Sequence, residues 1–357
     1  MTPADAIDLQ PNPARLPTAY CYDPFNLRHH LDGHPENRER LRSTWDLLQA
    51  EGALDGMLAV PSTAASEEQL LRVHRRRHLQ RVAQAARANA HLDPDTYVGT
   101  DSELAARLAA GGLCGVVEAV LTGQARNGFA LVRPPGHHAT PERGMGFCLY
   151  NNVAIAARAA QGEHGIERVL IVDFDVHHGN GTQEVFYQDG SVLFFSTHQY
   201  PYYPGTGHWH ETGRGAGEGT TVNVPFPAGV GDEGYQQAFD QVLVPLARRF
   251  EPQLILVSAG YDAHWNDPLA AMQLSIPGYA SLVDRLLALA DELCGGRLVF
   301  TLEGGYHLQV LAHAVLNTMR QLSGTFTAAS DPLGPSPWAG VDPREVLLQV
   351  RRAHGLA

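Results

Sequence analysis

The sequence has only four cysteines among 357 residues, and no two of them are in a CxxC spacing. A disulfide framework or a cysteine-rich structural zinc site is therefore not expected, and the thiols should be reduced and buried. The start of the chain lacks a charged segment followed by an apolar one, and no uninterrupted apolar run approaches the roughly 20 residues of a membrane helix. These absences predict a soluble, cytoplasmic protein with no membrane partner.

Basic residues are also scarce. Lys and Arg total 26 against 38 Asp and Glu, so the formal net charge is -12, and the longest basic run is three arginines at 75–77. An acidic surface repels phosphate backbones, so we expect no nucleic-acid partner, and the arginine run predicts an exposed helix face. The 44% hydrophobic content is ample for a large core. Homo-oligomerisation is left open.

Short apolar runs alternate with longer helical patterns along the chain. Eight of these runs are predicted strands, at 19–22, 57–60, 128–132, 169–175, 192–198, 220–225, 254–259 and 298–303. Several are apolar throughout, which is typical of parallel strands covered on both faces. Helical patterns lie between them, for example at 37–49, 102–121, 151–164, 234–250 and 277–293. The alternation predicts an α/β protein with three layers, an α/β/α sandwich.

The whole chain, 1–357, is predicted to form one domain. Residues 1–18 have the composition of a loose N-terminal arm, and the Pro/Gly/Ser-rich stretch 325–340 resembles a linker. A short amphipathic pattern at 343–354 predicts a C-terminal helix, which we expect to pack back on the domain.

A cluster of polar side chains follows the apolar run at 169–175. Strand side chains alternate between faces, so Asp173, Asp175 and His177 should project to one side. Buried carboxylates need a cation or dense hydrogen bonding, so a metal site and an ion-pair network are the alternatives. Asp262 follows the run at 254–259 and should reach the same sheet edge. One histidine and two carboxylates can hold a catalytic Zn²⁺ with an open position, which favours Asp175, His177 and Asp262 as ligands.

Two further motifs follow predicted strands. His137 and His138 lie in a stiff Pro-Pro-Gly turn, and adjacent imidazoles suit general acid/base catalysis near neutral pH. Tyr306 follows Glu303 and two glycines, and a phenol can donate a hydrogen bond to a developing oxyanion. The alternative for Tyr306 is an incidental half-buried loop tyrosine.

Together these motifs resemble the histone deacetylase superfamily, in particular class II deacetylases and their bacterial relatives, including acetylpolyamine amidohydrolases. The resemblance covers roughly residues 20–320 and is carried by residues 34–38, 133–138, 144–148, 173–182, 203–207, 258–262 and 302–306. It implies an arginase-like α/β/α sandwich around an eight-stranded parallel sheet. It also implies one zinc ion per chain, bound by Asp175, His177 and Asp262.

The resemblance assigns catalytic roles to five residues. His137 and His138 match the catalytic pair, with the second as general base, and Asp173 matches the carboxylate that orients the first imidazole. Asn180 gives the second imidazole a neutral partner, as in class II enzymes, and should leave it less biased toward the imidazolium. Tyr306 matches the tyrosine that polarises the carbonyl, where weakly active relatives have histidine.

The resemblance also implies a substrate tunnel. Phe147 and Tyr203 match its aromatic walls, and Gly146 lies where the family's backbone carbonyl meets the substrate amide. Leu269 replaces the glutamate with which polyamine-selective relatives attract a second ammonium. The implied substrate is therefore an acyl-lysine, in a peptide or protein, rather than a long acetylpolyamine, although an acylated small amine stays open.

Structural potassium is implied by the resemblance alone. One K⁺ site would use five residues, Asp173, Asp175, His177, Ser196 and Thr197. A second would use the carbonyls of Phe186, Asp189, Val192 and Thr220.

The predicted activity is zinc-dependent hydrolysis of an acylated amine, most simply N-ε-acyl-lysine deacetylation. Three alternatives keep the same pocket: an acetylpolyamine amidohydrolase, a non-catalytic module that binds acyl-lysine, and an arginase-like hydrolase with two metal ions. A purely scaffolding role would leave the polar residues at the strand ends unexplained. A binding module has no need of acid/base groups, so the two histidines and Tyr306 favour an enzyme.

Overall fold

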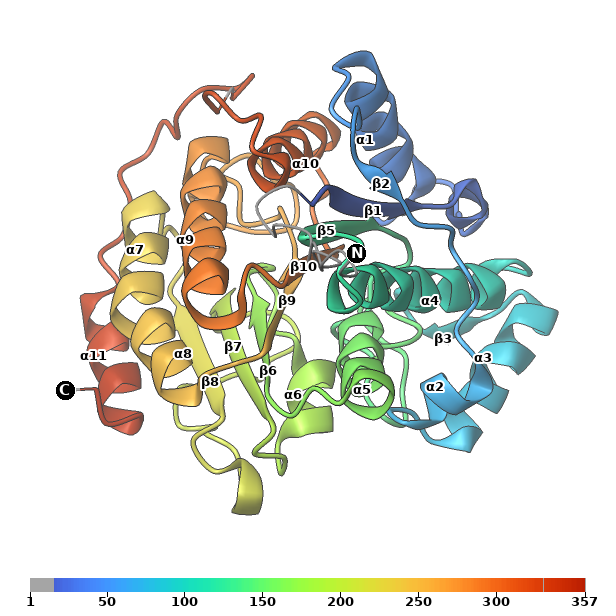
Figure 1. The fold of residues 1–357 in the computed structure, drawn as a ribbon, viewed down its shortest axis with the longest axis horizontal. Helices are drawn as coiled ribbons and strands as arrows, with labels where there is room; N and C mark the ends of the chain where they lie inside the picture. Colours follow the sequence, from blue (N-terminus) through green and yellow to red (C-terminus); the bar gives the residue numbers. More distant parts are fainter. Residues whose placement is uncertain (1–15, 330, 357) are drawn as a thin grey trace, which may run out of the picture.

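The computed structural model describes residues 16–329 and 331–356. Its centre is a sheet of eight parallel strands in the order β2-β1-β5-β10-β9-β6-β7-β8 (Figure 1). The strands are β1 (Thr18–Tyr22), β2 (Leu58–Ala59), β5 (Asn127–Leu131), β6 (Val169–Asp173), β7 (Val192–Gln199), β8 (Thr221–Phe226), β9 (Leu254–Ala259) and β10 (Leu298–Leu302). The predicted eight-stranded parallel sheet is thereby confirmed.

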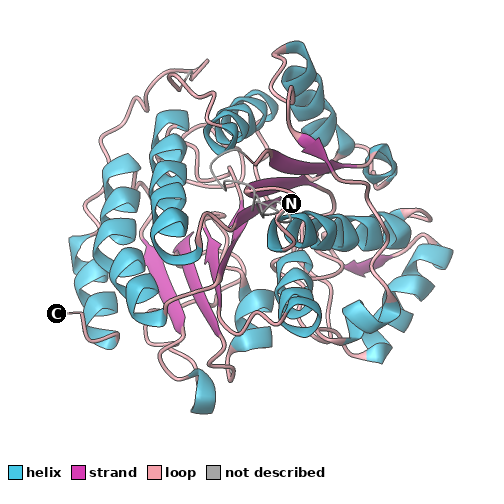
Figure 2. Ribbon diagram, viewed as in Figure 1, coloured by secondary structure: helices cyan, strands magenta, loops and turns pink. Residues whose placement is uncertain are grey.

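Helices cover both faces of the sheet (Figure 2). The helices are α1 (Arg38–Ala50), α2 (Glu67–Leu71), α3 (Arg76–Ala88), α4 (Ser102–Leu121), α5 (Asn152–His164), α6 (Asn180–Phe186), α7 (Asp232–Ala238), α8 (Val244–Phe250), α9 (Ile276–Cys294), α10 (Leu308–Ser323) and α11 (Arg344–Ala353). Short 3₁₀ turns occur at Pro24–Arg28 and Gly215–Gly217. The crossover connections that parallel strands require supply most of these helices.

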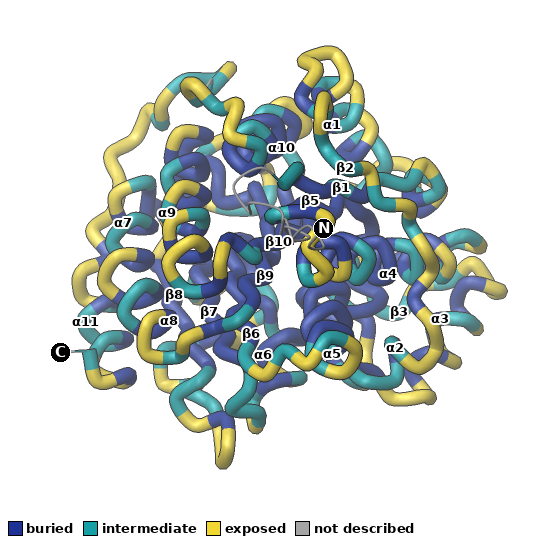
Figure 3. Tube along the Cα trace, viewed as in Figure 1, coloured by how far each residue is buried: buried dark blue, intermediate teal, exposed yellow. Residues whose placement is uncertain are grey.

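The two faces of the sheet belong to two separate hydrophobic clusters. Leu170 and Val172 of β6 pack with residues of α1, α9 and α10, whereas Val169 and Ile171 pack with residues of α3, α4 and α5. Successive strand side chains point to opposite faces, so a strand that is apolar at every position must be covered twice. Figure 3 shows the sheet buried between helices whose outer sides are exposed. The three-layer α/β/α sandwich is confirmed.

Several predicted boundaries were wrong. The strand predicted at 169–175 ends at Asp173, so Asp175 and His177 lie in the following loop rather than on the strand. The strand predicted at 57–60 shrinks to two residues. The helix predicted at 234–250 is interrupted by a π-helical turn at Phe239–Leu243. Elements that were not predicted are α2, α6, α10 and a small antiparallel pair, β3 (His91–Asp93) and β4 (Thr96–Tyr97). The arginine run at 75–77 is exposed at the start of α3, as predicted.

Both ends of the chain bear on the domain prediction. Residues 1–15 of the predicted arm lie outside the described residues, and β1 already begins at Thr18. The stretch 325–340 has no helix or strand in its described part. Helix α11 contacts β8 and buries Leu347 and Val350 in the larger core cluster.

Helix α4 is, by length and hydropathy, apolar enough to cross a membrane. In the structure most of its apolar window is buried, because it packs against α5, β1 and β5. Its composition is therefore accounted for by the core.

Candidate active site

Four neighbouring strands, β5, β10, β9 and β6, deliver polar loops to one edge of the sheet. Ligands in open α/β sheets bind at this carboxyl edge. A cavity of about 240 Å³ opens there. Its lining consists of Asp95, Pro135, His137, His138, Gly146, Phe147, His177, Tyr202, Tyr203, Leu269, Gly304 and Tyr306. Residues from well-separated motifs of the sequence thus meet in one pocket.

His177, which lines this pocket, forms a buried cluster with Asp175 and Asp262. One ligand atom from each lies within 4.8 Å of the others. His177 Nδ1 is 3.2 Å from Asp175 Oδ1 and 3.2 Å from Asp262 Oδ2. Among the described residues Asp262 Oδ2 has no hydrogen-bond partner although it is buried, a costly state that a cation would relieve. The donor set, one imidazole and two carboxylates, fits Zn²⁺ with a position left open.

Backbone groups fix the orientation of the two carboxylates. Asp175 accepts hydrogen bonds from the N–H groups of His177, at 2.9 Å, and Gly304, at 2.8 Å. Asp262 Oδ1 accepts one from Val176 N–H at 2.9 Å. A Cβ atom at Gly304 would lie 2.1 Å from Asp262 Oδ2, so only glycine permits this approach. The ligand atoms are therefore preorganised by the chain itself.

The electrostatic field between Asp175, His177 and Asp262 favours a positive charge. Burial opposes protonation of His177, but Asp175 and Asp262 hold its pKa well above the ordinary value. A metal ligand must be a neutral imidazole, so a proton and a metal ion compete for the same nitrogen. The arrangement stabilises a cation between the three side chains.

The tandem histidines lie beside this cluster, with ring centroids 4.0 Å apart. His137 Nδ1 is 2.9 Å from Asp173 Oδ2, and His138 Nδ1 is 2.8 Å from Asn180 Oδ1. Burial opposes charge on both rings, but Asp173 and Asp175 raise the pKa of His137 to about 10. Burial, with His137 and His177 nearby, holds the pKa of His138 well below its ordinary value. These shifts favour a cationic His137 and a neutral His138. A neutral imidazole can accept a proton, as a general base must.

Tyr306 enters the pocket from the loop after β10. Burial raises the pKa of its phenol well above the ordinary value, so the hydroxyl keeps its proton and can donate it in a hydrogen bond. The guanidinium of Arg40 lies 4.9 Å from the centre of its ring. This contact holds the ring through a cation–π interaction.

Aromatic side chains form the walls of the pocket. The rings of Phe147 and Tyr306 are nearly perpendicular, with centroids 5.9 Å apart, and those of Tyr203 and His138 are nearly perpendicular, with centroids 5.2 Å apart. Gly146 has φ +54°, and a Cβ there would lie 2.4 Å from His138 Cδ2. Phe147 has a positive φ of 68°, a strained backbone that the surrounding structure must enforce. Leu269 also lines the cavity, as does Tyr202, which was not predicted.

The residues predicted to bind potassium lie in two places. Ser196 and Thr197 are on β7, where Ser196 is the register partner of Asp173. Within residues 16–329 and 331–356, the buried Thr197 hydroxyl has no hydrogen-bond partner. That unpaired oxygen is compatible with an ion at the first site. In the second set, Asp189 N–H donates a hydrogen bond to the carbonyl of Phe186, and the Thr220 hydroxyl donates one to the carbonyl of Asp189. Val192 is the first residue of β7.

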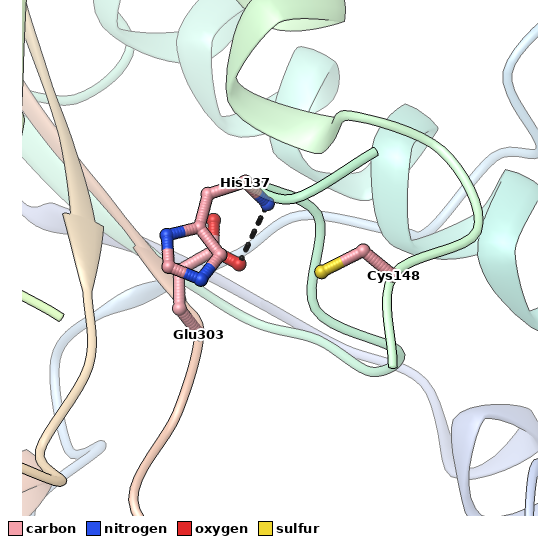
Figure 4. Close-up of side chains that lie close together, drawn as sticks. All are labelled: His137, Cys148 and Glu303. Carbon is pink, nitrogen blue, oxygen red and sulfur yellow. Dashed lines mark hydrogen bonds between the residues drawn. The ribbon is translucent and has the colours of Figure 1, made fainter. Parts of the chain in front are cut away.

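A second cluster, His137, Cys148 and Glu303, lies at the back of the histidine loop (Figure 4). Glu303 Oε2 accepts hydrogen bonds from the N–H groups of Gly136 and His137, and Oε1 accepts one from the Ser258 hydroxyl. These bonds satisfy the carboxylate without an ion. Sequence reasoning gave Glu303 no role, although a charged residue directly after an apolar strand was a signal.

His178, which completes the motif after β6, is turned away from the pocket. Its ring nitrogens lie 2.8 Å from the Thr206 hydroxyl and 3.0 Å from Gln183 Oε1. It is not among the residues that line the pocket.

Comparisons with known proteins identify the family of the chain. The sequence profile of the histone deacetylase domain matches residues 34–322. A probable deacetylase of Archaeoglobus fulgidus is 44% identical over 82% of this chain and 82% of its own length. A histone deacetylase-like amidohydrolase of Pseudomonas aeruginosa is 39% identical over 90% of this chain and 84% of its own length.

The fold also has a solved counterpart. The crystal structure of the HDA15 HD domain superimposes with a TM-score of 0.87 at 39% identity and covers 95% of both chains. The sheet described above is therefore that of the arginase/deacetylase fold. The chain belongs to the histone deacetylase family and is a hydrolytic deacetylase.

Proposed function

We propose that this deacetylase hydrolyses N-ε-acyl-lysine amides with a zinc ion held by Asp175, His177 and Asp262. One observation carries the proposal: His177 of a buried metal-binding triad lines the same cavity as the neutral imidazole of His138 and the protonated phenol of Tyr306. A module that only binds acyl-lysine would have no use for His138 and Tyr306 in these protonation states.

The ion, when bound, would polarise the acyl carbonyl and lower the pKa of water. Because Asn180 Oδ1 faces Nδ1 of His138, the ring hydrogen resides on Nδ1 and Nε2 is free. His138 Nε2 then takes a proton from the attacking water and passes it to the leaving amine. The Tyr306 hydroxyl donates a hydrogen bond to the oxyanion that forms at the carbonyl.

The walls of the cavity suit an apolar stem. Phe147 and Tyr203 present aromatic faces and edges, and Leu269 adds an uncharged aliphatic rim. Burial of methylene groups between such walls contributes about 0.8 kcal/mol per CH₂, enough to orient a lysine side chain. Leu269 has no charge with which to attract a second ammonium, which favours acyl-lysine over a long acetylpolyamine. We further propose structural K⁺ beside Ser196 and Thr197 of β7, where the Thr197 hydroxyl has no hydrogen-bond partner in the described part of the chain.

Tyr306→Phe tests the catalytic assignment. Loss of one oxyanion donor should lower kcat by about 10²–10³ while stoichiometric zinc is retained. Tyr22→Phe, on β1 outside the pocket lining and stacked on Trp45, is a matched control that should turn over normally. Normal turnover by Tyr306→Phe would contradict the proposal, as would full zinc content in the Asp175→Ala, Asp262→Ala double variant.

The substrate is tested separately. Turnover should be measured on acyl-lysine peptides of increasing acyl length and on acetylated polyamines. We expect a higher kcat/KM on acyl-lysine, and a preference for acetylpolyamines would overturn the substrate assignment while leaving the chemistry intact.

A further inference from the structure

Two loops carry the acid/base and oxyanion groups of the pocket, and each rests on one buried carboxylate. Behind the histidine loop, Glu303 Oε2 accepts the consecutive N–H groups of Gly136, at 2.7 Å, and His137, at 3.2 Å. Behind the tyrosine loop, Asp267 Oδ2 accepts the consecutive N–H groups of Tyr306, at 2.7 Å, and His307, at 3.2 Å. The two arrangements are the same in form.

Neither carboxylate is free to move. Glu303 is 0% exposed, and its second oxygen accepts the Ser258 hydroxyl at 3.0 Å. Asp267 is 6% exposed, and its second oxygen accepts Leu269 N–H at 3.0 Å. Each buried carboxylate accepts three hydrogen bonds, and leaving one of these buried donors unpaired would be costly, so each is an anchor for the backbone in front of it.

The anchored peptides set the positions of the reacting groups. The carbonyl of His137 accepts the N–H groups of Gly181 and Thr182, at 3.0 and 3.1 Å, so the peptide groups flanking this residue are held from two sides. Gly136 has no room to shift, because a Cβ there would lie 2.5 Å from Asn152 N. Misplacement of a catalytic group by about 1 Å can cost on the order of 10²-fold in rate.

We propose that Glu303 and Asp267 are positioning residues of the deacetylase: Glu303 places the His137–His138 pair, and Asp267 places Tyr306. Neither touches the substrate in the proposed reaction. The inference rests on the proposed function, since it is through His138 and Tyr306 that the two carboxylates would act.

The hydrogen bonds around the two residues predict different effects when each carboxylate is replaced by an amide. In Glu303→Gln the amide oxygen can accept both N–H groups, and its NH₂ can donate to Ser258, whose hydroxyl has no other partner among the described residues. In Asp267→Asn no orientation satisfies three N–H donors, because the NH₂ must face one of them. We expect kcat to fall less than about threefold in Glu303→Gln and about tenfold or more in Asp267→Asn, because an unmade buried hydrogen bond is costly.

A double-mutant cycle separates positioning from general loosening. Asp267→Ala should lower kcat by about 30-fold in the wild-type background, but by less than about threefold when Tyr306 is already phenylalanine, because the hydroxyl that it places is gone. KM should change little in either background, and zinc content should stay stoichiometric. An equal factor in both backgrounds would overturn the role of Asp267.

The control is Asp232→Ala. Asp232 also accepts a backbone N–H and a hydroxyl, both from Ser275, but lies outside the pocket. It should lower thermal stability without lowering kcat per folded, zinc-loaded molecule. A similar loss of kcat in Asp232→Ala, or a Glu303→Gln loss as large as that of Asp267→Asn, would overturn the inference.

Failure of the proposed function would look different. Wild-type enzyme without turnover of any acyl-lysine peptide would contradict that proposal, whereas an active wild type with equally active Glu303→Ala and Asp267→Ala variants would contradict only the positioning roles.

Discussion

Asn180 is the hydrogen-bond partner of the proposed base, and Asn180→Asp tests how a charge at this position changes the pKa of that base. The change is isosteric and places a carboxylate oxygen 2.8 Å from His138 Nδ1, where an amide oxygen stands now. Burial holds the pKa of His138 well below its ordinary value, with His137 and His177 adding to the effect. A negative charge in hydrogen-bond contact should raise that pKa.

The size of the shift follows from the distance. Two unit charges about 4 Å apart at an effective dielectric constant of about 20 interact by about 4 kcal/mol, or about 3 pKa units. Burial of the new carboxylate offsets part of this, so we expect a rise of about 1–2 units. The base must be neutral to accept a proton, so activity is lost as pH falls through its pKa. The acidic limb of kcat/KM should therefore move to higher pH in Asn180→Asp, and activity should recover at alkaline pH.

The assay is kcat/KM for an acetyl-lysine peptide between pH 5 and 10, with zinc content measured at each pH. Asn180→Ala is the control, because it removes the hydrogen bond without adding charge; it should lower activity at every pH without moving the limb. A limb at the wild-type position in Asn180→Asp would refute His138 as the titrating base.

Three further outcomes are expected. Leu269→Glu should raise kcat/KM for acetylated polyamines relative to acetyl-lysine peptide, and an unchanged ratio would refute its place at the pocket rim. Gly304→Ala should lower zinc affinity measured by chelator competition, because the new methyl would lie 2.1 Å from Asp262 Oδ2; wild-type affinity would contradict the ligand geometry. Burial alone would raise the pKa of Glu36, but Arg133 and its other partners hold it well below the ordinary value, so its stabilisation is present above the unfolded-state pKa and is lost as pH falls through the folded-state pKa. Glu36→Gln should then lower the free energy of unfolding at pH 7 by about 3–5 kcal/mol in denaturant titration, and a change under about 1 kcal/mol would contradict a buried charge pair.

The sheet was predictable because several of its strands are apolar at nearly every position. The strand at Leu254–Ala259 was predicted to the residue. The strand at 169–175 was overextended, because Phe174 and Val176 are fully buried and prolong the apolar pattern after the backbone has left the sheet. Hydrophobic periodicity reports burial, and only hydrogen bonding between strands defines where a strand ends.

Many residues of the pocket could be predicted from the sequence, but the long-range hydrogen bonds that hold them in place could not. Residues that follow apolar strands meet at one edge by topology alone, which is why Asp262 could be grouped with Asp175. The hydrogen bond from Arg40 to the carbonyl of Gly305 joins residues 265 positions apart, and no local sequence pattern predicts it. The same holds for Asp267, which a sequence shows only as an aspartate before a proline.

The loop after β10 joins the three chemical parts of the site within four residues. Glu303 anchors the backbone of His137 through its side chain, Gly304 donates its N–H to Asp175 at 2.8 Å, and Tyr306 supplies the phenol. A backbone shift in this loop therefore displaces the base, a metal ligand and the oxyanion donor together. The loop after β6 has no such direct hydrogen bond to the phenol among the described residues. Rigidity is needed most where one segment serves three functions, and the buried carboxylates on either side of this loop supply it.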